Sequence, residues 1–300
     1  WTAGPCANAT NPTCTVAVSG PVTLTAEVQP EPVALTATQV SAGDQHACAV
    51  RPGDGSVWCW GANGSGQRGD GGTSTVSRPT QTVTATGPLT GMREVRSGRD
   101  HTCARGIDGS VWCWGSNADG KLAQPVGVTV ATRAVRVTGL PTAGIASLAV
   151  GDDWTCAVGA SFRYCWGLVP PGLSSRVPTN YMSFSAALVA VAGARDHGCV
   201  VDAEDGGNVW CWGSNNTQQL TAGAQGGNIN LELTSPAVLA PGGTAAQPRL
   251  AVGSGPDANL RDGHTCAIVA GGQVRCWGQG TFGALGTGST SDNGVPTTVT

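Results

Sequence analysis

The chain has 300 residues, 12% of them charged, and a formal net charge of −3 at pH 7. A surface that binds nucleic-acid phosphates needs a basic excess, so this balance argues against nucleic acid as a partner. The sequence holds no run of about twenty apolar residues, so we expect no membrane insertion. Short β-type segments lie between Gly, Pro, Asn and Asp, without long helical periodicity, and they predict an all-β fold.

The first part of the chain differs from the rest. Its Trp-x-x-Gly-x-Cys and Cys-x-Val patterns, which contain Cys6 and Cys14, resemble the end of a small secreted bacterial β-repeat module. That resemblance implies a Cys6–Cys14 bridge and two domains, with residues 1–31 as the C-terminal part of the module and 32–300 as the second. Because the sequence opens on Trp1 and not on a charged and apolar leader, we expect a piece of a longer, multi-module chain.

A five-residue segment, Val-Trp-Cys-Trp-Gly, then recurs along the chain. The copies, full or weakened, are Val57–Gly61, Val111–Gly115, Arg163–Gly167, Val209–Gly213 and Val274–Gly278. A second cysteine precedes each copy, and a histidine lies two residues before that cysteine in four repeats, whereas the third repeat has Trp154 there. Self-similarity at this spacing predicts a repeat architecture.

The spacing of the two cysteines predicts a hairpin in each repeat. A three-residue loop at Ile107–Gly109, with Gly109 in the left-handed position, places Cys103 opposite Cys113. Residues opposed at a site without hydrogen bonds lie about 4.5–5.5 Å apart, which suits a disulfide worth about 2–3 kcal/mol. Loop length varies between repeats while the cysteine register is kept. We therefore predict that all cysteines are paired: Cys6, Cys14, Cys48, Cys59, Cys103, Cys113, Cys156, Cys165, Cys199, Cys211, Cys266 and Cys276.

Two consequences follow from paired cysteines. A zinc site needs four converging ligands, and each repeat offers at most one histidine and two cysteines, so we predict neither a metal nor another cofactor. Disulfides form in oxidising compartments, so we predict a secreted or cell-surface protein.

Each repeat contains four strand segments. A β-branched strand ending in Gly precedes the hairpin, and a proline-led strand, such as Pro79–Val83 or Pro125–Val128, follows it. Both faces of the Val-Trp-Cys-Trp strand are apolar, which favours sheets stacked face to face around an axis. We predict a β-propeller of about five four-stranded blades with one hairpin disulfide each, in which the strand at Val295–Thr300 completes the first blade and closes the ring.

The full motif, Gly-x-x-His-x-Cys followed by Val-x-Cys-Trp-Gly-x-Asn-x-x-Gly-Gln-Leu-Gly, resembles the repeat of the regulator of chromosome condensation family. Gly43–Gly69 matches it almost throughout, and Trp114–Leu122 and Trp277–Gly286 match its second half. The resemblance covers about residues 33–300 and implies a β-propeller. The familiar propellers of the family have seven blades, whereas five repeats occur here. Two alternatives therefore stay open: the ring has five blades, or sequence outside these 300 residues completes it.

No residue pattern points to catalysis. All four histidines occupy the same repeat position, which favours a structural hydrogen bond between strands, and the tryptophans other than Trp154 are assigned to the core. Aspartates recur beside the histidines, where turn formation is the simpler interpretation and calcium binding the alternative. The sequence has no Gly-x-Ser-x-Gly nucleophile elbow. We predict no catalytic, cofactor-binding or metal-binding residues.

The favoured function is a non-enzymatic extracellular scaffold that binds a protein or glycan through propeller loops at 62–78, 168–184 and 214–235. Trp154, Tyr181 and Phe184 are the candidate partner contacts, because aromatic side chains anchor interfaces.

Three other functions were weighed. The family resemblance implies one of them, inhibition of a secreted enzyme, because β-lactamase-inhibiting propellers of bacteria share the repeat. Guanine nucleotide exchange is disfavoured by the acidic surface, whose only lysine is Lys121. A carbohydrate-active enzyme would need unique inward carboxylates, and none stands out.

Overall fold

The computed structural model describes residues 34–160, 162–169, 173–183, 188–202, 209–220, 229–235, 250–254, 263–268 and 273–300. The chain divides into two units between Leu35 and Thr36. The first unit lies almost entirely outside the described residues, as do Cys6 and Cys14, so the predicted module and its bridge stay predictions. Within the described part, no helix is long and apolar enough to cross a membrane.

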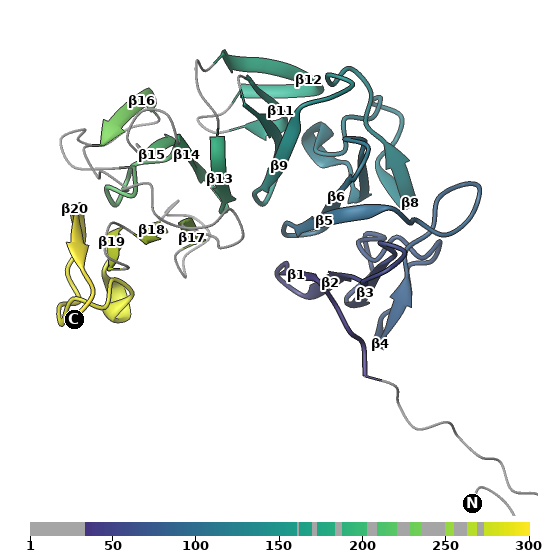
Figure 1. Cartoon of the computed structure of the whole chain (residues 1–300), viewed down its shortest axis with the longest axis horizontal. Helices are drawn as coiled ribbons and strands as arrows, with labels where there is room; N and C mark the ends of the chain where they lie inside the picture. The colour runs from purple at the N-terminus through teal and green to yellow at the C-terminus, as the bar shows by residue number, and fades with distance from the viewer. Residues whose placement is uncertain are drawn as a thin grey trace, which may run out of the picture. The chain divides into compact units, whose positions relative to one another are not determined.

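The second unit contains five antiparallel sheets of four strands, each built from strands consecutive in sequence (Figure 1). In chain order the strands are β1 Gln39–Ala42, β2 His46–Val50, β3 Val57–Gly61, β4 Val76–Gln81, β5 Met92–Ser97, β6 His101–Gly106, β7 Val111–Ser116, β8 Val130–Arg136, β9 Ile145–Val150, β10 Trp154–Gly159, β11 Phe162–Val169, β12 Leu173–Ser183, β13 Leu188–Gly193, β14 His197–Asp202, β15 Val209–Gly213, β16 Ile229–Ser235, β17 Leu250–Ser254, β18 Gly263–Ile268, β19 Val274–Gly278 and β20 Asn293–Thr298. Two short 3-10 helices, η1 (Ala118–Gly120) and η3 (Thr281–Gly283), follow the second and fifth hairpins. The predicted all-β architecture of five four-stranded blades is confirmed.

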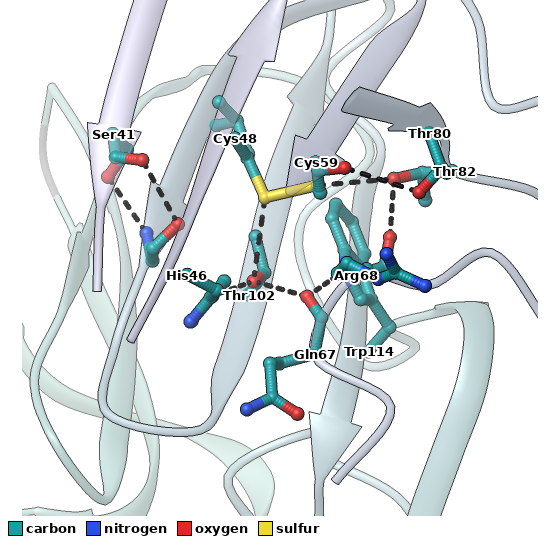
Figure 2. Close-up of a disulfide and its surroundings, with 12 residues drawn as sticks. Ser41, His46, Cys48, Cys59, Gln67, Arg68, Thr80, Thr82, Thr102 and Trp114 are labelled. Carbon is teal, nitrogen blue, oxygen red and sulfur yellow. Dashed lines mark hydrogen bonds between the residues drawn. A yellow bond between two sulfur atoms is a disulfide. The ribbon is translucent and has the colours of Figure 1, made fainter. Parts of the chain in front are cut away.

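The predicted hairpin register is also confirmed. In the second blade Cys103 lies opposite Cys113, and Gly109 has the left-handed φ of +80° that the loop requires. Five disulfides join the two central strands of the five blades, and Figure 2 shows the first, Cys48–Cys59. No described cysteine is free.

The predicted ring closure is wrong. The C-terminal strand β20 pairs with β19 and forms the outer edge of the fifth blade. The first blade is already complete with β1, β2, β3 and β4. The physical reason is local: the chain after each Trp-Gly segment folds back onto its own hairpin, so the fourth strand belongs to the repeat that it follows.

Two of the proline-led strands are also displaced. In the second blade the outer strand begins at Val130, beyond Pro125, because Asn117 holds the intervening chain as a loop. The Asn117 Nδ2 donates to the Val128 carbonyl at 2.6 Å, and the Asn117 backbone N–H donates to the Thr129 carbonyl at 2.8 Å. In the fourth blade the outer strand β16 ends before Pro236.

The core lies between consecutive blades as well as inside them. One cluster joins Cys48 and Val57 of the first blade to Val95 and Trp114 of the second. A similar cluster joins each later pair of neighbours. Each large apolar side chain buried there contributes about 1.5–3 kcal/mol relative to exposure. The inner strands contact one another in the order β1, β5, β9, β13 and β17, so the blades follow one another about their inner strands.

Candidate functional site

The inner strands of all five blades end around one cavity of about 200 Å³. Its lining includes the residue three positions before the histidine, or before Trp154 in the third blade, in the first four blades: Gly43, Gly98, Gly151 and Ala194. A Cβ at Gly43 or Gly98 would lie within 2.4 Å of a carbonyl oxygen of the next blade. At Gly43 and Gly98 the turn therefore needs glycine so that neighbouring blades can approach closely.

The residue two positions before the histidine, or before Trp154, alternates in charge from blade to blade, and it forms what we call the rim: Asp44, Arg99, Asp152 and Arg195. Two of the four are paired with carboxylates of the third blade. The Arg99 guanidinium lies 2.6 Å from Asp153, and the Arg195 guanidinium lies 2.9 Å from Asp152. The rim is thus a charged surface at the point where the blades converge.

Asp44 differs from the other rim residues. It is exposed, and it makes no ion pair with any residue that the structure describes. Partial burial and the nearby Asp152 raise the pKa of Asp44, while Arg195 and Arg99 lower it. Its carboxylate therefore faces both signs of charge and stays available to a partner.

The single lysine of the chain lies beneath the rim. The Lys121 side chain is fully buried, and its ammonium group contacts Asp100 of the second blade and Asp153 of the third, the latter at 2.8 Å. A buried ammonium is stable only when carboxylates and hydrogen bonds compensate it. This pair of contacts ties the second blade to the third.

The histidines form hydrogen bonds from one blade to the next. The His46 Nε2 lies 2.8 Å from the Thr102 hydroxyl, which donates to the Gln67 carbonyl at 3.0 Å (Figure 2). The same carbonyl accepts the Trp114 indole N–H at 2.8 Å. Since the single hydroxyl proton goes to Gln67, Nε2 of His46 must carry the proton of the imidazole.

The arrangement recurs at two further junctions. His101 bonds Thr155, and His197 bonds Thr265. Burial lowers the pKa of His46 to about 4 and that of His197 to about 3. These histidines are neutral at physiological pH, and the predicted structural role is confirmed, with the hydrogen bonds running between blades.

Trp154, which replaces histidine in the third blade, is not a partner contact. It is 1% exposed, donates its indole N–H to the Arg195 carbonyl at 3.0 Å and packs edge-on against Trp212 at 5.8 Å. The fourth blade has Gly198 where its neighbours have threonine, and a Cβ there would lie 2.8 Å from the Trp154 ring. A large ring therefore fills the space that the missing threonine leaves.

The other predicted contacts are placed only in part. Tyr181 is half-buried against the core cluster of the third and fourth blades, and burial raises its pKa. Its role in binding stays a prediction, and Phe184 lies outside the described residues. The predicted core is partly wrong, because Trp58 and Trp60 of the first blade are only half-buried.

Sequence reasoning missed the rim. It treated the recurring aspartates as turn formers and did not consider Arg99 and Arg195, which occupy the position of Asp44 and Asp152. The signal was present: one turn position alternates between acid and base while its neighbours repeat.

Five successive four-stranded sheets, each with the same cross-strand disulfide between its two central strands, define a β-propeller built from one repeat. Models of the regulator of chromosome condensation (RCC1) repeat match residues 37–67, 93–121 and 262–284, and a second model matches 54–105. The chain contains RCC1 repeats at these positions and folds as a β-propeller, as the resemblance in its sequence predicted.

Two curated relatives show how widely the repeat is used. The chain is 27% identical to human E3 ubiquitin-protein ligase HERC2 over 319 residues, which cover 89% of this chain and 6% of the ligase. It is also 27% identical to the ultraviolet-B receptor UVR8 of Arabidopsis thaliana over 270 residues, covering 86% of this chain and 56% of the receptor. The chain thus spans only part of each relative.

Solved structures show the same fold. Human WBSCR16 superposes with a TM-score of 0.68 at 23% identity, covering 87% of this chain and 66% of that one. Yeast RCC1 superposes with a TM-score of 0.70 at 18% identity, covering 87% of this chain and 60% of that one.

Proposed function

We propose that the protein is a non-enzymatic interaction scaffold that binds a protein partner through the rim. The observation that carries this proposal is a charged rim on a stiff frame: Asp44, Arg99, Asp152 and Arg195 project where cross-linked and hydrogen-bonded blades converge. Recognition residues on a rigid frame lose little conformational entropy on binding. The relatives support this proposal. A ubiquitin ligase and an ultraviolet-B receptor, which have different activities, both resemble this chain. A fold shared by proteins of such different function does not by itself imply a catalytic activity.

The residue types argue for binding over catalysis. Three of the four histidines, which would be the usual general bases, are held in hydrogen bonds between blades, and burial lowers their pKa values. The cysteines in the described part of the chain are used in disulfides. Both arginines of the rim are paired with carboxylates of the third blade, so they present a fixed pattern of charge to a partner.

We further propose that this scaffold works outside the cell, as a secreted or surface protein of bacterial type. Five disulfides within one described unit support an oxidising compartment. A glycan partner is the alternative ligand.

The test compares two isosteric substitutions, Asp44→Asn at the rim and Asp119→Asn in the exposed loop of η1. The disulfide-bonded protein is immobilised, exposed to the extracellular protein fraction of its source and to a glycan array, and captured proteins are located by cross-linking and mass spectrometry. We expect a protein that cross-links near the rim and whose capture is weakened by Asp44→Asn alone. Equal capture by both variants, or binding to glycans alone, would contradict the proposal.

A further inference from the structure

Two cavities flank the tip of the β6–β7 hairpin, away from the rim. The larger, of about 480 Å³, lies between the hairpin and the segment 84–92 that leads from the first blade to the second. The smaller, of about 260 Å³, lies between the hairpin and the segment 136–142. Both are lined by Asp108, Ser110 and Arg136, so these residues form a bridge between the two hollows. We call the whole feature the hairpin groove.

The groove holds one arginine, Arg136, beside the carboxylate of Asp108 but without a direct bond to it. Arg136 is exposed, and within residues 34–160, all of them described, its guanidinium makes no hydrogen bond or ion pair. The nearby carboxylate does not neutralise it directly, because Asp108 accepts hydrogen bonds from the Ser110 backbone at 3.0 Å and from its hydroxyl at 2.7 Å. A guanidinium in this state is free to hold a carboxylate in a two-pronged contact.

An aromatic ring with a set orientation lies beside that charge. Trp112 is directly opposite Arg136 in the β7–β8 pairing, so the two side chains share one face of the sheet. The Trp112 indole N–H donates to the Ser110 hydroxyl at 3.2 Å, and Ser110 is itself held by Asp108. The ring is therefore positioned before any ligand arrives.

Apolar side chains complete the groove. Leu89 and Met92 are buried in its lining, whereas Ile107 at the hairpin tip is 79% exposed. The aliphatic lining offers contact area to an apolar side chain of a ligand. The groove thus combines one free cation with an apolar wall.

The repeat itself does not explain Arg136. In the other blades whose outer pairing includes the same position, the residue opposite is Gln81, Asn180, Thr234 or Thr298. The fold therefore accepts small or neutral side chains there. An arginine at this one position points to recognition.

We propose that the hairpin groove binds an extended peptide segment in which an acidic residue neighbours an aliphatic one. The carboxylate pairs with Arg136, and the aliphatic side chain packs on Ile107 and Trp112. A single guanidinium fits one carboxylate better than a phosphate-rich ligand, which would need several basic groups. The aliphatic wall favours a peptide over a sugar. This site is separate from the rim and does not rest on the function proposed for it.

The probe is an array of acetylated hexapeptide amides that carry one Asp or Glu among Leu, Ile and Val, each with an Asn or Gln counterpart. The full disulfide-bonded chain is used. We expect acidic peptides to bind about tenfold or more tightly than their amide counterparts. Arg136→Gln removes this preference, Ile107→Asp weakens binding, and Arg78→Gln, which changes an exposed arginine on β4, leaves both unchanged.

Three outcomes would overturn the proposal. One is an equal affinity for acidic and amide peptides in the unmodified protein. Another is an acid preference that survives Arg136→Gln, or that is lost in the rim variant Asp44→Asn instead. The third is binding of carboxylated sugars on a glycan array without binding of any peptide. A thermal melt of each variant confirms that the frame is intact.

Discussion

The histidines of the first, second and fourth repeats are buried, neutral and hydrogen-bonded to the next blade. At the first junction the Nε2 proton of His46 goes to a threonine hydroxyl 56 residues away, and its Nδ1 has no donor facing it among the described residues. Protonation of His46 would therefore place a second, unpartnered N–H in a dry interface. Burial accordingly lowers the pKa of His46 to about 4 and that of His197 to about 3.

This arrangement predicts a loss of stability in mild acid. A histidine in the unfolded chain has a pKa of about 6.5 and binds a proton below that pH, whereas the folded chain does not. The contribution of these neutral histidines to the free energy of unfolding should therefore be greatest above about pH 6.5. It should fall as the pH drops toward 4, by at most about 1.4 kcal/mol per pH unit for each histidine. Urea denaturation at pH 7.5, 6.0, 5.0 and 4.5 measures this slope.

The variant His46→Gln separates this effect from carboxylate titration, because glutamine keeps an N–H donor and has no charge to gain. Its stability at pH 7.5 should be lower and its slope between pH 6 and 4.5 shallower than in the unmodified protein. Parallel slopes would show that burial does not lower the pKa of His46 in the folded chain.

At the scale of elements, one junction between blades is built differently from the others. At three junctions between blades, a histidine of one blade bonds a threonine of the next. At the junction of the third and fourth blades, Trp154 and Gly198 occupy these two positions. A Cβ at Gly198 would lie 2.5 Å from Trp212 and 2.8 Å from Trp154. The Arg163 guanidinium lies 4.3 Å from the centre of a Trp212 ring, so this interface is held by aromatic packing.

A double-mutant cycle on these two positions should show strong coupling. Gly198→Thr alone forces atoms into the Trp154 ring, and Trp154→His alone leaves a cavity, so each should cost about 2–5 kcal/mol. The double variant restores the pair of the other junctions and should be more stable than the sum of the single losses predicts, by about 0.5–3 kcal/mol. Guanidinium denaturation gives the free energies of unfolding of the unmodified protein, the two single variants and the double variant. If the two losses simply add in the double variant, Trp154 and Gly198 do not replace the His–Thr pair as a unit.

At the scale of the whole molecule, two kinds of link stabilise the propeller, one within blades and one between them. Disulfides lie inside blades, between strands that are already neighbours. Hydrogen bonds and ion pairs such as Lys121–Asp153 link one blade to the next. Stability in such an array is close to a sum of repeat and interface contributions.

Removing one disulfide should therefore have a bounded cost. The variant Cys103→Ala/Cys113→Ala opens a short hairpin loop and should lose about 2–3 kcal/mol while keeping the propeller fold. Denaturation measures the loss, and mass spectrometry of the alkylated, non-reduced protein should find no free thiol. Free thiols, or loss of the circular dichroism of the whole sheet system, would mean that the sulfurs link more than single hairpins.

Local information in the chain determined much of this protein. The spacing of the cysteines settled the hairpin register, and the two apolar faces of Val-Trp-Cys-Trp settled that both sides of the strand are covered, because strand alternation is a property of consecutive residues. Tertiary structure alone decided which threonine receives each histidine, that Trp154 is buried and how the rim charges pair. Those outcomes depend on residues more than 40 positions apart, such as Trp154 and Arg195, and packing between blades brings them together.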